Sequence, residues 1–445
     1  MILLPNGSVL FFQDDQLTGP RGSGGFTFAY LWDVTANTFT ADNNTTTDVF
    51  CSGHAFLPNG QLFVAGGHVN SSEQGTRTAF LFDYTSNTWN DTNTLMNNAR
   101  WYPTVTTLAN GEMLVTSGSI SSSAGVDLVP EVWQTNLAGG WRELSNASLS
   151  QPLYPWMFLA PNGKVFDAGP SQTTRYLDAS GAGAWSYVAD HLYAASRAYG
   201  SPVMYDEGKV VVMGGGDPPT NTVEIIDLNA GRPTWQTVSP MAYARTQLNA
   251  TLLPDGKVLV TGGTSSSGWN DATLAVLPAE MWDPATQSFS TMASMQVPRL
   301  YHSEAILLPD GRVIAAGTGR AAPVNGTDEP NAQIYSPPYL FQADGSPAVR
   351  PTITSVSATS VTYGQQFSVA TPDAANISGV TWIRLSATTH SFNENQRINR
   401  LGFTRTAGAL TVTAPSTSAL CPPGHYLLFI LKGGVPSIAR VMQIQ

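Results

Sequence analysis

Residues able to bind a metal or carry an electron recur at one position of a repeat. Apolar segments run into turns that end at glycines 45 to 55 residues apart: Gly7, Gly60, Gly111, Gly163, Gly208, Gly256 and Gly311. From Gly60 onward, the residue nine places earlier occupies the same place in each copy: Cys51, Tyr102, Tyr154, Tyr199, Gln247 and His302. A position that is only packed would hold Val, Leu or Ala. Thiol, phenol and imidazole groups instead indicate metal or redox chemistry.

In a propeller these residues would share one place, because the first strand of every blade lines the central axis. Cys51 and Tyr102 are one repeat apart, so we expect them on neighbouring blades at the same height. His302 would lie across the same ring, with Tyr301 beside it. Successive strand residues point to opposite faces, so Tyr301 and His302 can share a target only where the strand end twists or bulges.

The repeat itself predicts such a propeller. An apolar strand precedes each turn, a second strand often ends in a glycine pair such as Gly66-Gly67, and a third carries an aromatic residue and Asp, as at Trp282-Asp283. A short fourth strand follows. Four short strands per unit with glycine punctuation are typical of a kelch-type blade. The seven turn glycines therefore predict seven blades.

The repeat pattern stops after Leu340, and a linker rich in Gly and Pro follows at residues 345–351. Alternating strands then continue to the end, which is typical of a small immunoglobulin-like β-sandwich. We predict an all-β chain: a seven-bladed kelch-type β-propeller over residues 1–345, followed by a β-sandwich domain over residues 346–445. The seventh blade lacks a clear fourth strand, so we expect the N-terminal closing strand to be missing from this chain.

Composition limits the possible partners. The formal net charge of −10 argues against nucleic acid and against anionic membrane surfaces, and no apolar run reaches the length that spans a bilayer. Charged residues make up only 12% of the chain, a composition common among secreted proteins. Residues 1–12 already read as a repeat strand, so we expect an extracellular protein whose export signal lies upstream of Met1.

Several segments together resemble the copper radical oxidases, the family of galactose oxidase and glyoxal oxidase. The matching segments, in chain order, are Phe50-Cys51-Ser52-Gly53, Arg100-Trp101-Tyr102-Pro103, Ala244-Arg245-Thr246, Tyr301-His302-Ser303 with Leu308-Pro309-Asp310-Gly311, Ala387-Thr388-Thr389-His390 with Gln396-Arg397, and Pro423-Gly424. Each is short, but together and in this order they are specific and cover nearly the whole chain.

The resemblance implies a role for each residue. Tyr102 would be an equatorial copper ligand, joined to Cys51 by a thioether, and this modified phenol would hold a radical. Tyr301 would be the axial ligand and the base that accepts the substrate proton. His302 and His390 would supply two imidazole ligands, with His390 delivered by a loop of the sandwich. Such a set of nitrogen and oxygen ligands suits Cu(II).

The reaction that the resemblance implies is the oxidation of a primary alcohol or aldehyde. One copper ion and one organic radical together supply two oxidising equivalents, and dioxygen restores them and leaves as hydrogen peroxide. The partners would then be a small alcohol or aldehyde and O2, and we expect a monomer.

The chain departs from galactose oxidase near the radical site. Galactose oxidase has a Trp that stacks over the thioether, where this chain has Ile120, so shielding would need another aromatic. Trp101 is typical of glyoxal-oxidase-like sequences. Trp269 lies in a loop that borders the substrate mouth in this family, and is a candidate pocket wall. Together with the absence of the sugar-binding domain, these differences favour a glyoxal-oxidase-like substrate over galactose.

Other interpretations compete with this one. A kelch propeller that only binds a protein or glycan would need no copper, and a disulfide-tied structural protein would need Cys51 near Cys421. His425 is an alternative second imidazole, although the motif favours His390. We interpret the remaining residues as structural. Cys421 would be a partly buried free thiol, His54 and His68 strand or loop histidines, and His191 a surface histidine. Tyr154 and Tyr199 would line the channel, and Asp83, Asp227 and Asp283 would be turn residues.

Overall fold

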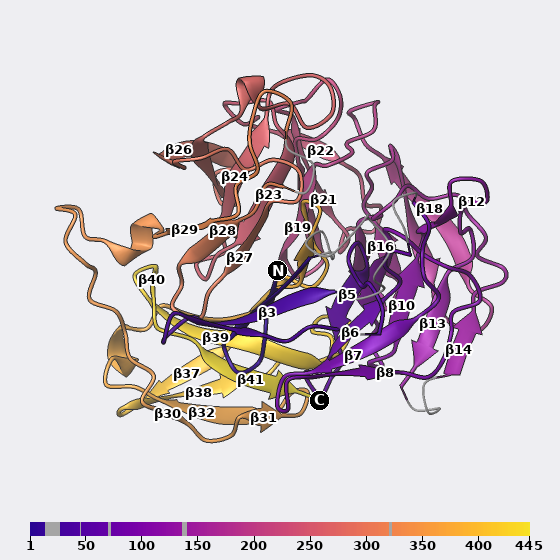
Figure 1. The fold of residues 1–445 in the computed structure, drawn as a ribbon. Helices are drawn as coiled ribbons and strands as arrows, with labels where there is room; N and C mark the ends of the chain where they lie inside the picture. Colours follow the sequence, from indigo (N-terminus) through magenta and orange to yellow (C-terminus); the bar gives the residue numbers. More distant parts are fainter. Residues whose placement is uncertain (14–26, 45, 70–72, 136–139, 320–322) are drawn as a thin grey trace.

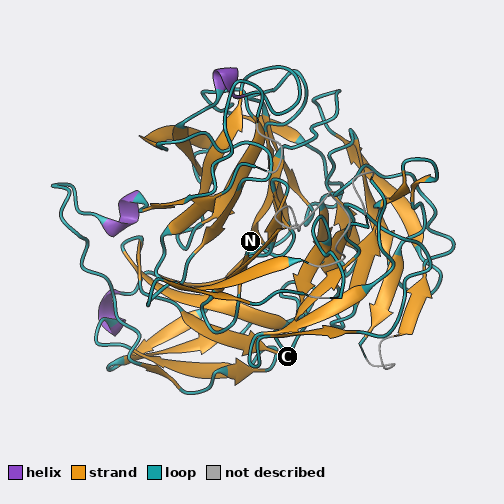
Figure 2. Ribbon diagram, in the orientation of Figure 1, coloured by secondary structure: helices purple, strands orange, loops and turns teal. Residues whose placement is uncertain are grey.

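The protein is described here by a computed structural model covering residues 1–13, 27–44, 46–69, 73–135, 140–319 and 323–445 (Figure 1). β-Strands dominate it (Figure 2), and helical structure within these ranges is limited to the short 3-10 turns η1 (Ala272–Leu274), η2 (Pro338–Leu340) and η3 (Ala374–Asn376). None of the described helices has the length and apolar character needed to cross a bilayer. The prediction of an all-β chain is confirmed.

Seven sheets follow one another through the first part of the chain, six with four strands and one with three. The first four are β1–β4 (Ile2–Leu3, Val9–Gln13, Phe28–Asp33, Thr38–Ala41), β5–β8 (Gly53–Phe56, Leu62–Ala65, Ala79–Asp83, Thr88–Asp91), β9, β10, β13 and β14 (Thr104–Thr107, Met113–Thr116, Glu131–Gln134, Gly140–Glu143) and β15–β18 (Met157–Leu159, Val165–Asp167, Thr173–Asp178, Ala184–Asp190). The other three are β19–β22 (Ser201–Asp206, Lys209–Met213, Val223–Asp227, Gln236–Val238), β23–β26 (Thr246–Leu252, Val258–Thr264, Pro278–Asp283, Ser288–Ser294) and β27–β29 (Glu304–Leu307, Val313–Ala316, Ala332–Tyr335). A small hairpin, β11 (Ser119–Ser121) and β12 (Gly125–Val126), extends from the third sheet.

These sheets succeed one another around a common centre (Figure 1). The arrangement is the predicted propeller, and its sheets are consistent with seven blades. The sheet of β27–β29 has three strands in the described part of the chain, and the absence of a closing strand stays a prediction.

The turn between the first two strands of each blade uses glycine for its backbone conformation. All seven turn glycines of the repeat have φ between 69° and 89°. Glycine enters this left-handed region without the steric cost that a Cβ atom brings. The amide of Gly60, for example, donates to the carbonyl of Leu57 at 3.0 Å and closes the turn. The seven units are therefore structural copies in the register that the sequence predicted.

The recurring position nine residues earlier has its own backbone signature. Its six occupants all have φ between 48° and 64°: Cys51, Tyr102, Tyr154, Tyr199, Gln247 and His302. A left-handed conformation costs a residue with a side chain about 1–2 kcal/mol. Backbone hydrogen bonds between blades hold it, for the amide of Tyr102 donates to the carbonyl of Cys51 at 3.0 Å and that of Tyr154 to Tyr102 at 2.9 Å.

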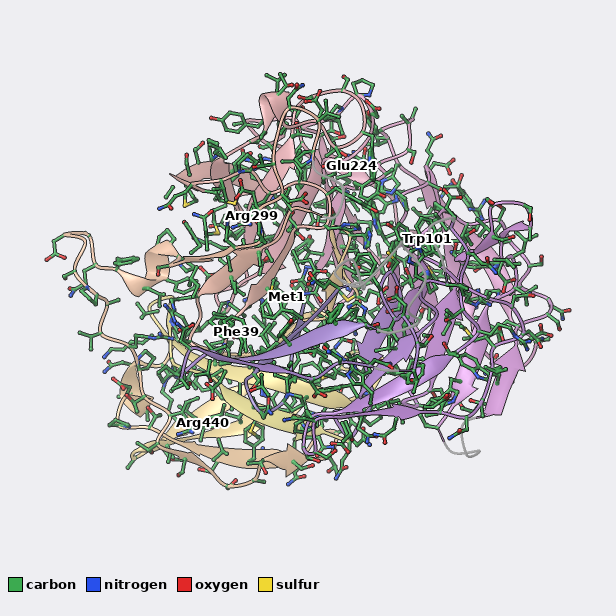
Figure 3. The ribbon with its side chains drawn as sticks, viewed as in Figure 1. Met1, Phe39, Trp101, Glu224, Arg299 and Arg440 are labelled. Atoms are coloured by element: carbon green, nitrogen blue, oxygen red, sulfur yellow. The ribbon has the colours of Figure 1, made fainter. Side chains whose placement is uncertain are left out.

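In each of four blades, a buried arginine just ahead of this position links strands of the same blade. These arginines are Arg100, Arg197, Arg245 and Arg299, the last of which is labelled in Figure 3. In the sixth blade, Arg245 donates to the carbonyl of Gly262 at 2.9 Å and to the carboxylate of Glu280 at 2.7 Å. The guanidinium thus joins the approach to the first strand to the second and third strands.

The C-terminal strands form two packed sheets, the predicted β-sandwich. One sheet holds β30 (Ser355–Val356), β32 (Gln366–Ala370), β38 (Ala409–Thr413) and β37 (Phe403–Thr406). The other holds β31 (Ser360–Val361), β41 (Arg440–Ile444), β39 (Gly424–Lys432), β33 (Gly379–Arg384) and β36 (Ile398–Arg400), with β40 (Val435–Pro436) on β39. Their core includes Trp382, Phe367 and Tyr426. The predicted boundary at residue 345 falls between β29 and β30 and stays a prediction.

One hairpin of the sandwich contacts the inner strands of the propeller. It consists of β34 (Thr388–Thr389) and β35 (Phe392–Asn393), and contacts β27 and β19. Just before it, Ala387 bridges to Ile2 of β1. Sandwich residues such as Ile383 and Phe429 belong to the same hydrophobic core as the propeller strands. The two parts of the chain are therefore packed as one body around the hairpin.

Candidate metal centre

Five residues predicted from the sequence meet in one cluster: Cys51, Tyr102, Tyr301, His302 and His390. The sulfur of Cys51 and a ring nitrogen each of His302 and His390 lie within 4.8 Å of one another. The hydroxyl of Tyr102 lies 2.9 Å from Nε2 of His390 and also hydrogen-bonds the hydroxyl of Tyr301. The second, third and seventh blades and the sandwich hairpin each contribute to this cluster.

The left-handed backbone of His302 lets Tyr301 and His302 share a target. With φ at 62°, His302 breaks the alternation of a flat strand just before β27 begins. The two rings then lie with centroids 3.6 Å apart and planes 31° from parallel. Nδ1 of His302 lies 2.9 Å from the carbonyl of Gly319, to which it donates as N–H. That hydrogen bond fixes the tautomer and leaves Nε2 as the lone-pair nitrogen.

A tight turn in the inserted hairpin positions His390. Thr389 pairs with Phe392, so His390 and Ser391 form a two-residue loop, with φ of 46° and 69°. Positive φ at both positions is the type I′ turn, whose twist matches that of the flanking strands. Nδ1 of His390 lies 2.6 Å from the hydroxyl of Thr389, and the carbonyl of Ser391 accepts a hydrogen bond from Ser201 at 2.6 Å.

Burial favours the neutral forms of Tyr102 and His390. It raises the pKa of Tyr102 well above its ordinary value, and the nearby Cys51 and Tyr301 add to that shift. Burial also lowers the pKa of His390 well below its ordinary value, helped by the charges of His302 and His54. A neutral imidazole is the form that binds a metal, and a bound cation would favour the phenolate.

Trp101 covers the ring of Tyr102. The two rings stack with centroids 3.7 Å apart and planes 20° from parallel. Tyr102 has a positive φ, and this backbone conformation brings the side chain of Trp101 over the ring of Tyr102. Tyr301 lies over the ring of His302 in the same way. An aromatic therefore fills the role for which Ile120 is unsuited. The sequence carried a signal for this contact, because Trp101 is adjacent to Tyr102.

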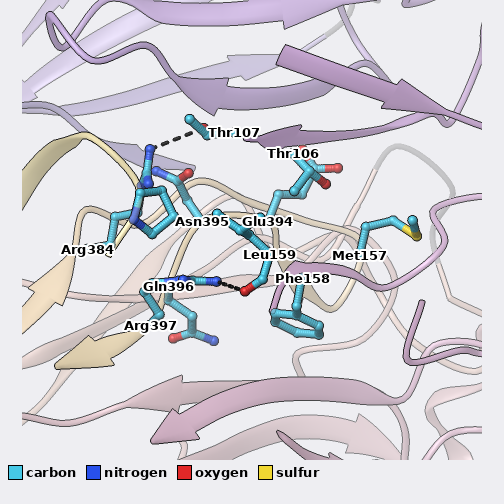
Figure 4. A pocket seen from close by; sticks show the side chains of 11 residues that line it. Thr106, Thr107, Met157, Phe158, Leu159, Arg384, Glu394, Asn395, Gln396 and Arg397 are labelled. Carbon is cyan, nitrogen blue, oxygen red and sulfur yellow. Dashed lines mark hydrogen bonds between the residues drawn. The ribbon is translucent and has the colours of Figure 1, made fainter. Parts of the chain in front are cut away.

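A cavity of about 420 Å³ opens on this centre. Cys51, His302 and His390 lie along it, and its other walls come mostly from the first and seventh blades. A smaller cavity (Figure 4) lies around Glu394, with hydrogen bonds from Arg384 to Thr107 at 3.1 Å and from Arg397 to Leu159 at 2.8 Å. Three of the five clustered residues line the larger cavity and none lines the smaller one, so the larger is the candidate substrate site; Tyr102 and Tyr301 are not among its lining residues.

Comparison with known proteins agrees with this geometry. Residues 23–169 and 217–339 match the family model described as glyoxal oxidase N-terminus. The chain belongs to the glyoxal oxidase family. Residues 350–444 match the galactose oxidase-like early set domain.

Several relatives of this glyoxal oxidase family member are named as oxidases. Galactose oxidase from Gibberella zeae is 30% identical over 470 residues, covering 99% of this chain and 67% of that protein. Aldehyde oxidase GLOX from Vitis pseudoreticulata is 28% identical over 441 residues, covering 89% of this chain and 82% of that protein. A solved structure of a fungal alcohol oxidase of the AA5 family, in complex with copper, superposes with a TM-score of 0.90 at 29% identity, covering 100% of this chain and 96% of that one.

The other aromatic residues at the recurring position pack around the ligand cluster of this family member. Tyr154 contacts the rings of Tyr102 and His390 at centroid distances of 4.6 and 4.7 Å. Trp269, which is 51% exposed, meets the ring of Tyr301 edge-on at 4.5 Å, and Tyr199 meets it at 5.9 Å. Trp269 does not line the 420 Å³ cavity, so its role as a pocket wall stays a prediction.

The expected surface position of His191 is wrong, and Cys421 is a free thiol as expected but fully rather than partly buried. His191, expected on the surface, is only 2% exposed: its ring nitrogens lie 2.7 Å from Glu224 and 2.9 Å from the carbonyl of Ala168. Cys421 is a free thiol fully buried in the sandwich core, which rules out the disulfide with Cys51. The aspartates repeating with the blade are turn residues as expected, since Asp83 accepts from the amide of Thr85 at 2.8 Å.

The remaining histidines lie in different surroundings. His425 packs edge-on against Tyr84, with ring centroids 6.4 Å apart, and is not part of the ligand cluster. Nδ1 of His68 lies 3.6 Å from the carboxylate of Asp48. His54, which the sequence suggested was a strand-face histidine, lines the 420 Å³ cavity. Nothing in its local sequence pattern marks that position.

Proposed function

We propose that the protein is a copper radical oxidase that converts primary alcohols to aldehydes, or hydrated aldehydes to acids, while reducing O2 to H2O2. The observation that carries this proposal is the convergence of one thiol, two phenols and two imidazoles from four separate parts of the chain. The oxidase names of its relatives support it.

The side chains of the cluster fit a copper ion. Tyr102, Tyr301, His302 and His390 would hold it, through two phenol oxygens and two imidazole nitrogens. Cu(II) favours such mixed nitrogen and oxygen ligands. The hydrogen bonds from His302 to Gly319 and between His390 and Thr389 orient the rings, as partners of ligating histidines usually do. Bound copper would supply a one-electron acceptor beside the organic one.

Cys51 and Tyr102 would supply the organic acceptor. The two pack in one buried cluster, completed by Tyr154 and partly by Trp101. A thioether between the sulfur and the phenol ring forms when S–H and ring C–H each lose a hydrogen, with O2 as the oxidant. Sulfur on the ring donates electron density and makes the phenol easier to oxidise. The stacked Trp101 limits solvent access to the same ring.

Tyr301 would be the group that accepts the substrate hydroxyl proton. Its hydroxyl is hydrogen-bonded to that of Tyr102, at the centre of the cluster. Trp269 and Tyr199 enclose the edges of its ring. For an alcohol, the balance is RCH2OH + O2 → RCHO + H2O2. Both hydrogens lost by the substrate appear in the peroxide.

Peroxide release tests the proposal. We expect copper-loaded protein to release H2O2 from a panel of alcohols, glyoxal and methylglyoxal in a peroxidase-coupled assay. Tyr102→Phe should lose at least about a thousandfold in kcat, since it removes both a ligand and the radical group. Tyr187→Phe, at an exposed site on β18, is the matched control. Copper-loaded protein that releases no peroxide from any substrate would contradict the proposal and favour a propeller that only binds.

We also propose that the protein is extracellular, which the low content of charged residues supports, and that it is a monomer. Light scattering across a range of concentrations tests the oligomeric state. A mass that rises with concentration would contradict it.

A further inference from the structure

The sandwich segment that delivers His390 also fastens the inner strands of several blades. The first strand of each blade is at the edge of its sheet, so its inward backbone groups have no partner within the blade. Side chains that follow the hairpin supply such partners. In the sixth blade, Gln396 accepts from the amide of Leu252 at 3.0 Å and donates to the carbonyl of Ala250 at 2.8 Å, both on β23. This contact ties the segment to one blade.

Glu394, four residues after His390, contacts two blades instead of one. Its Oε2 accepts from the amide of His54 on β5 at 2.6 Å, and its Oε1 from the amide of Val105 on β9 at 3.4 Å. The side chain, which lines the small cavity of Figure 4, is 7% exposed. The backbone amide of Glu394 donates to the carbonyl of Ala387 at 2.9 Å, across the base of the hairpin. The carboxyl is therefore held at a fixed place between the second and third blades.

The two amides that meet this carboxyl have matching places in their blades. His54 is the third residue after Cys51. Val105 is likewise the third residue after Tyr102. The two strands approach closely here, because a Cβ atom on Gly53 would lie only 2.7 Å from a backbone oxygen of the neighbouring blade. One carboxyl group thus spans the two strands that carry the thiol and the phenol of the cluster.

We propose that Glu394 is a positioning residue for the thioether, whose two hydrogen bonds hold β5 and β9 so that the sulfur of Cys51 meets the ring of Tyr102. This inference rests on the proposed oxidase function and concerns the assembly of its redox centre. In the reaction, the S–H bond and one ring C–H bond break, a C–S bond forms, and O2 takes both hydrogens and leaves as H2O2. Glu394 acts on this step only through the two strands.

A carboxyl group suits this bridge because it offers two acceptor oxygens. Burial raises the pKa of Glu394 well above its ordinary value, although the two amide hydrogen bonds act to lower it. The neutral form is therefore favoured, and both of its oxygens still carry lone pairs. Glutamine keeps one acceptor oxygen and replaces the other with an NH2 group, which cannot accept from an amide. Leucine removes both acceptors at a similar volume.

The rate of cross-linking tests the inference. Protein purified without copper is given copper and O2, and denaturing gels follow the faster migration of a chain that the thioether has closed into a loop. Glu394→Leu should lengthen the half-time by about tenfold or more, because a displacement of about 1 Å between reacting groups can slow a reaction about a hundredfold. Glu394→Gln should recover part of the loss. An unchanged half-time in Glu394→Leu would overturn the inference.

Gln396→Leu is the matched control. It also removes two hydrogen bonds between this segment and the inner strand of a blade, but β23 carries neither cross-linked residue. Both leucine variants should lower the urea midpoint, whereas only Glu394→Leu should slow the cross-linking markedly. Equal slowing in Glu394→Leu and Gln396→Leu would show a general weakening of the hairpin and would overturn a specific role for Glu394.

The finished centre separates positioning from an electrostatic effect. Once the thioether has formed, the covalent bond holds the sulfur and the ring together without Glu394. Fully cross-linked Glu394→Leu should therefore have the reduction potential and the electron paramagnetic resonance signal of the parent radical. A shifted potential together with an unchanged cross-linking rate would mean that Glu394 acts on the finished radical, which contradicts the inference.

Failure of this inference is distinguishable from failure of the oxidase proposal. Parent protein that binds copper and forms no cross-link under O2 would overturn the proposed redox centre. Parent protein that cross-links, with Glu394→Leu keeping the same pace, would overturn only the role of Glu394. The copper content of each variant, measured alongside the rates, shows that the same fraction of ligand clusters is loaded.

Discussion

The residues that converge on the proposed centre owe their direction to an unfavourable backbone conformation. Cys51, Tyr102 and His302 all have positive φ, although none is glycine. Strain of this kind persists only where surrounding structure holds it. Here, amide-to-carbonyl bonds between neighbouring blades do so, as between Tyr102 and Cys51 at 3.0 Å. The same backbone turn folds the residue before it, Trp101 or Tyr301, onto the ring that follows.

The stack of Trp101 on Tyr102 leads to a prediction about the radical. Trp101→Ala removes an aromatic contact of the kind worth about 0.5–1.5 kcal/mol and opens the phenol to water. The oxidised radical form should then decay about two- to tenfold faster after chemical oxidation. Electron paramagnetic resonance, followed over time at constant temperature, measures the half-life.

The control for this change is Trp141→Ala. Trp141 packs on Phe63 within the blades, at a centroid distance of 6.2 Å, and touches none of the clustered residues. The radical of that variant should decay as in the parent. Equal half-lives in Trp101→Ala and the parent would show that stacking does not protect the radical.

At the scale of single residues, much of the candidate site could be predicted from the sequence. A fixed spacing of nine residues from each turn glycine locates Cys51, Tyr102 and His302, because every blade uses the same hairpin. His390 could be placed only by its motif, since a hairpin from the other part of the chain delivers it. The position of His54 on the cavity depends on packing between the first and second blades, which no local pattern records.

Within each blade, a buried arginine links the strands that carry the recurring position. Arg245 and Glu280 are both fully buried, with the closest nitrogen and oxygen 2.7 Å apart. Glu280 also accepts a hydrogen bond from the amide of Ala242 at 2.6 Å. Removing the guanidinium would leave a buried carboxylate with no opposite charge.

Breaking this pair should be strongly destabilising. Arg245→Met is expected to lower the free energy of unfolding by about 3–5 kcal/mol, the cost of an uncompensated buried charge. Arg400→Met breaks an exposed pair with Asp206, 3.7 Å apart, and should cost less than about 1 kcal/mol. Urea unfolding followed by tryptophan fluorescence compares them. Similar losses in the two variants would contradict the proposed role of the buried arginines.

Glu224 links the fourth and fifth blades and should respond to acid. Its burial acts to raise the pKa, but hydrogen bonds from His191 and the charges of Arg197 and His191 outweigh burial and lower it from 4.5 to about 2. A folded pKa below the unfolded one means that the carboxylate stabilises the fold above pH 4.5. That stabilisation is lost as the pH falls from 4.5 through about 2.

The measurement is the urea midpoint as a function of pH. In Glu224→Gln the midpoint should be lower near neutral pH and should change less than in the parent between pH 4.5 and 2. Glu143→Gln alters an exposed carboxylate on β14 and should follow the parent. Parallel curves for the parent and Glu224→Gln would contradict this assignment.

The wrong prediction for His191 shows that sequence alone does not reveal contacts between elements far apart in the chain. The sequence alone predicted a surface position for His191. The structure buries it because its hydrogen-bond partners come from Ala168 and Glu224 and its ring stacks on Trp235 at 4.0 Å. These partners lie on or beside three separate strands, so only the folded chain shows them.

Across the whole molecule, propeller and sandwich share one hydrophobic core. Its sandwich members lie on or beside β33, β36 and β39: Ile383, Leu385, Ala387, Ile398, Leu427 and Phe429. The repeat and the alternating strands were enough to predict both parts. Their shared core could not be predicted, because a strand pattern indicates which residues are buried but not which other elements they pack against.

This shared core predicts that the two parts remain together after the linker is cut. A protease site inserted in the exposed turn at Asp344 and Gly345 should be cleaved readily in the native protein. The two pieces should still elute as one species on gel filtration and should separate only in denaturant. Separation of the pieces under native conditions would mean that the parts are independent domains joined by little more than the linker.

The most direct test of the central claim is a peptide map of the protein after exposure to copper and O2. If Cys51 and Tyr102 form the redox centre, mass spectrometry of the reduced and digested protein should find the peptides carrying them joined, with a mass two hydrogens below their sum. The peptide carrying Tyr301 should be unmodified. Recovery of the Cys51 peptide alone, with a thiol fully open to alkylation, from protein that has bound copper would contradict the account.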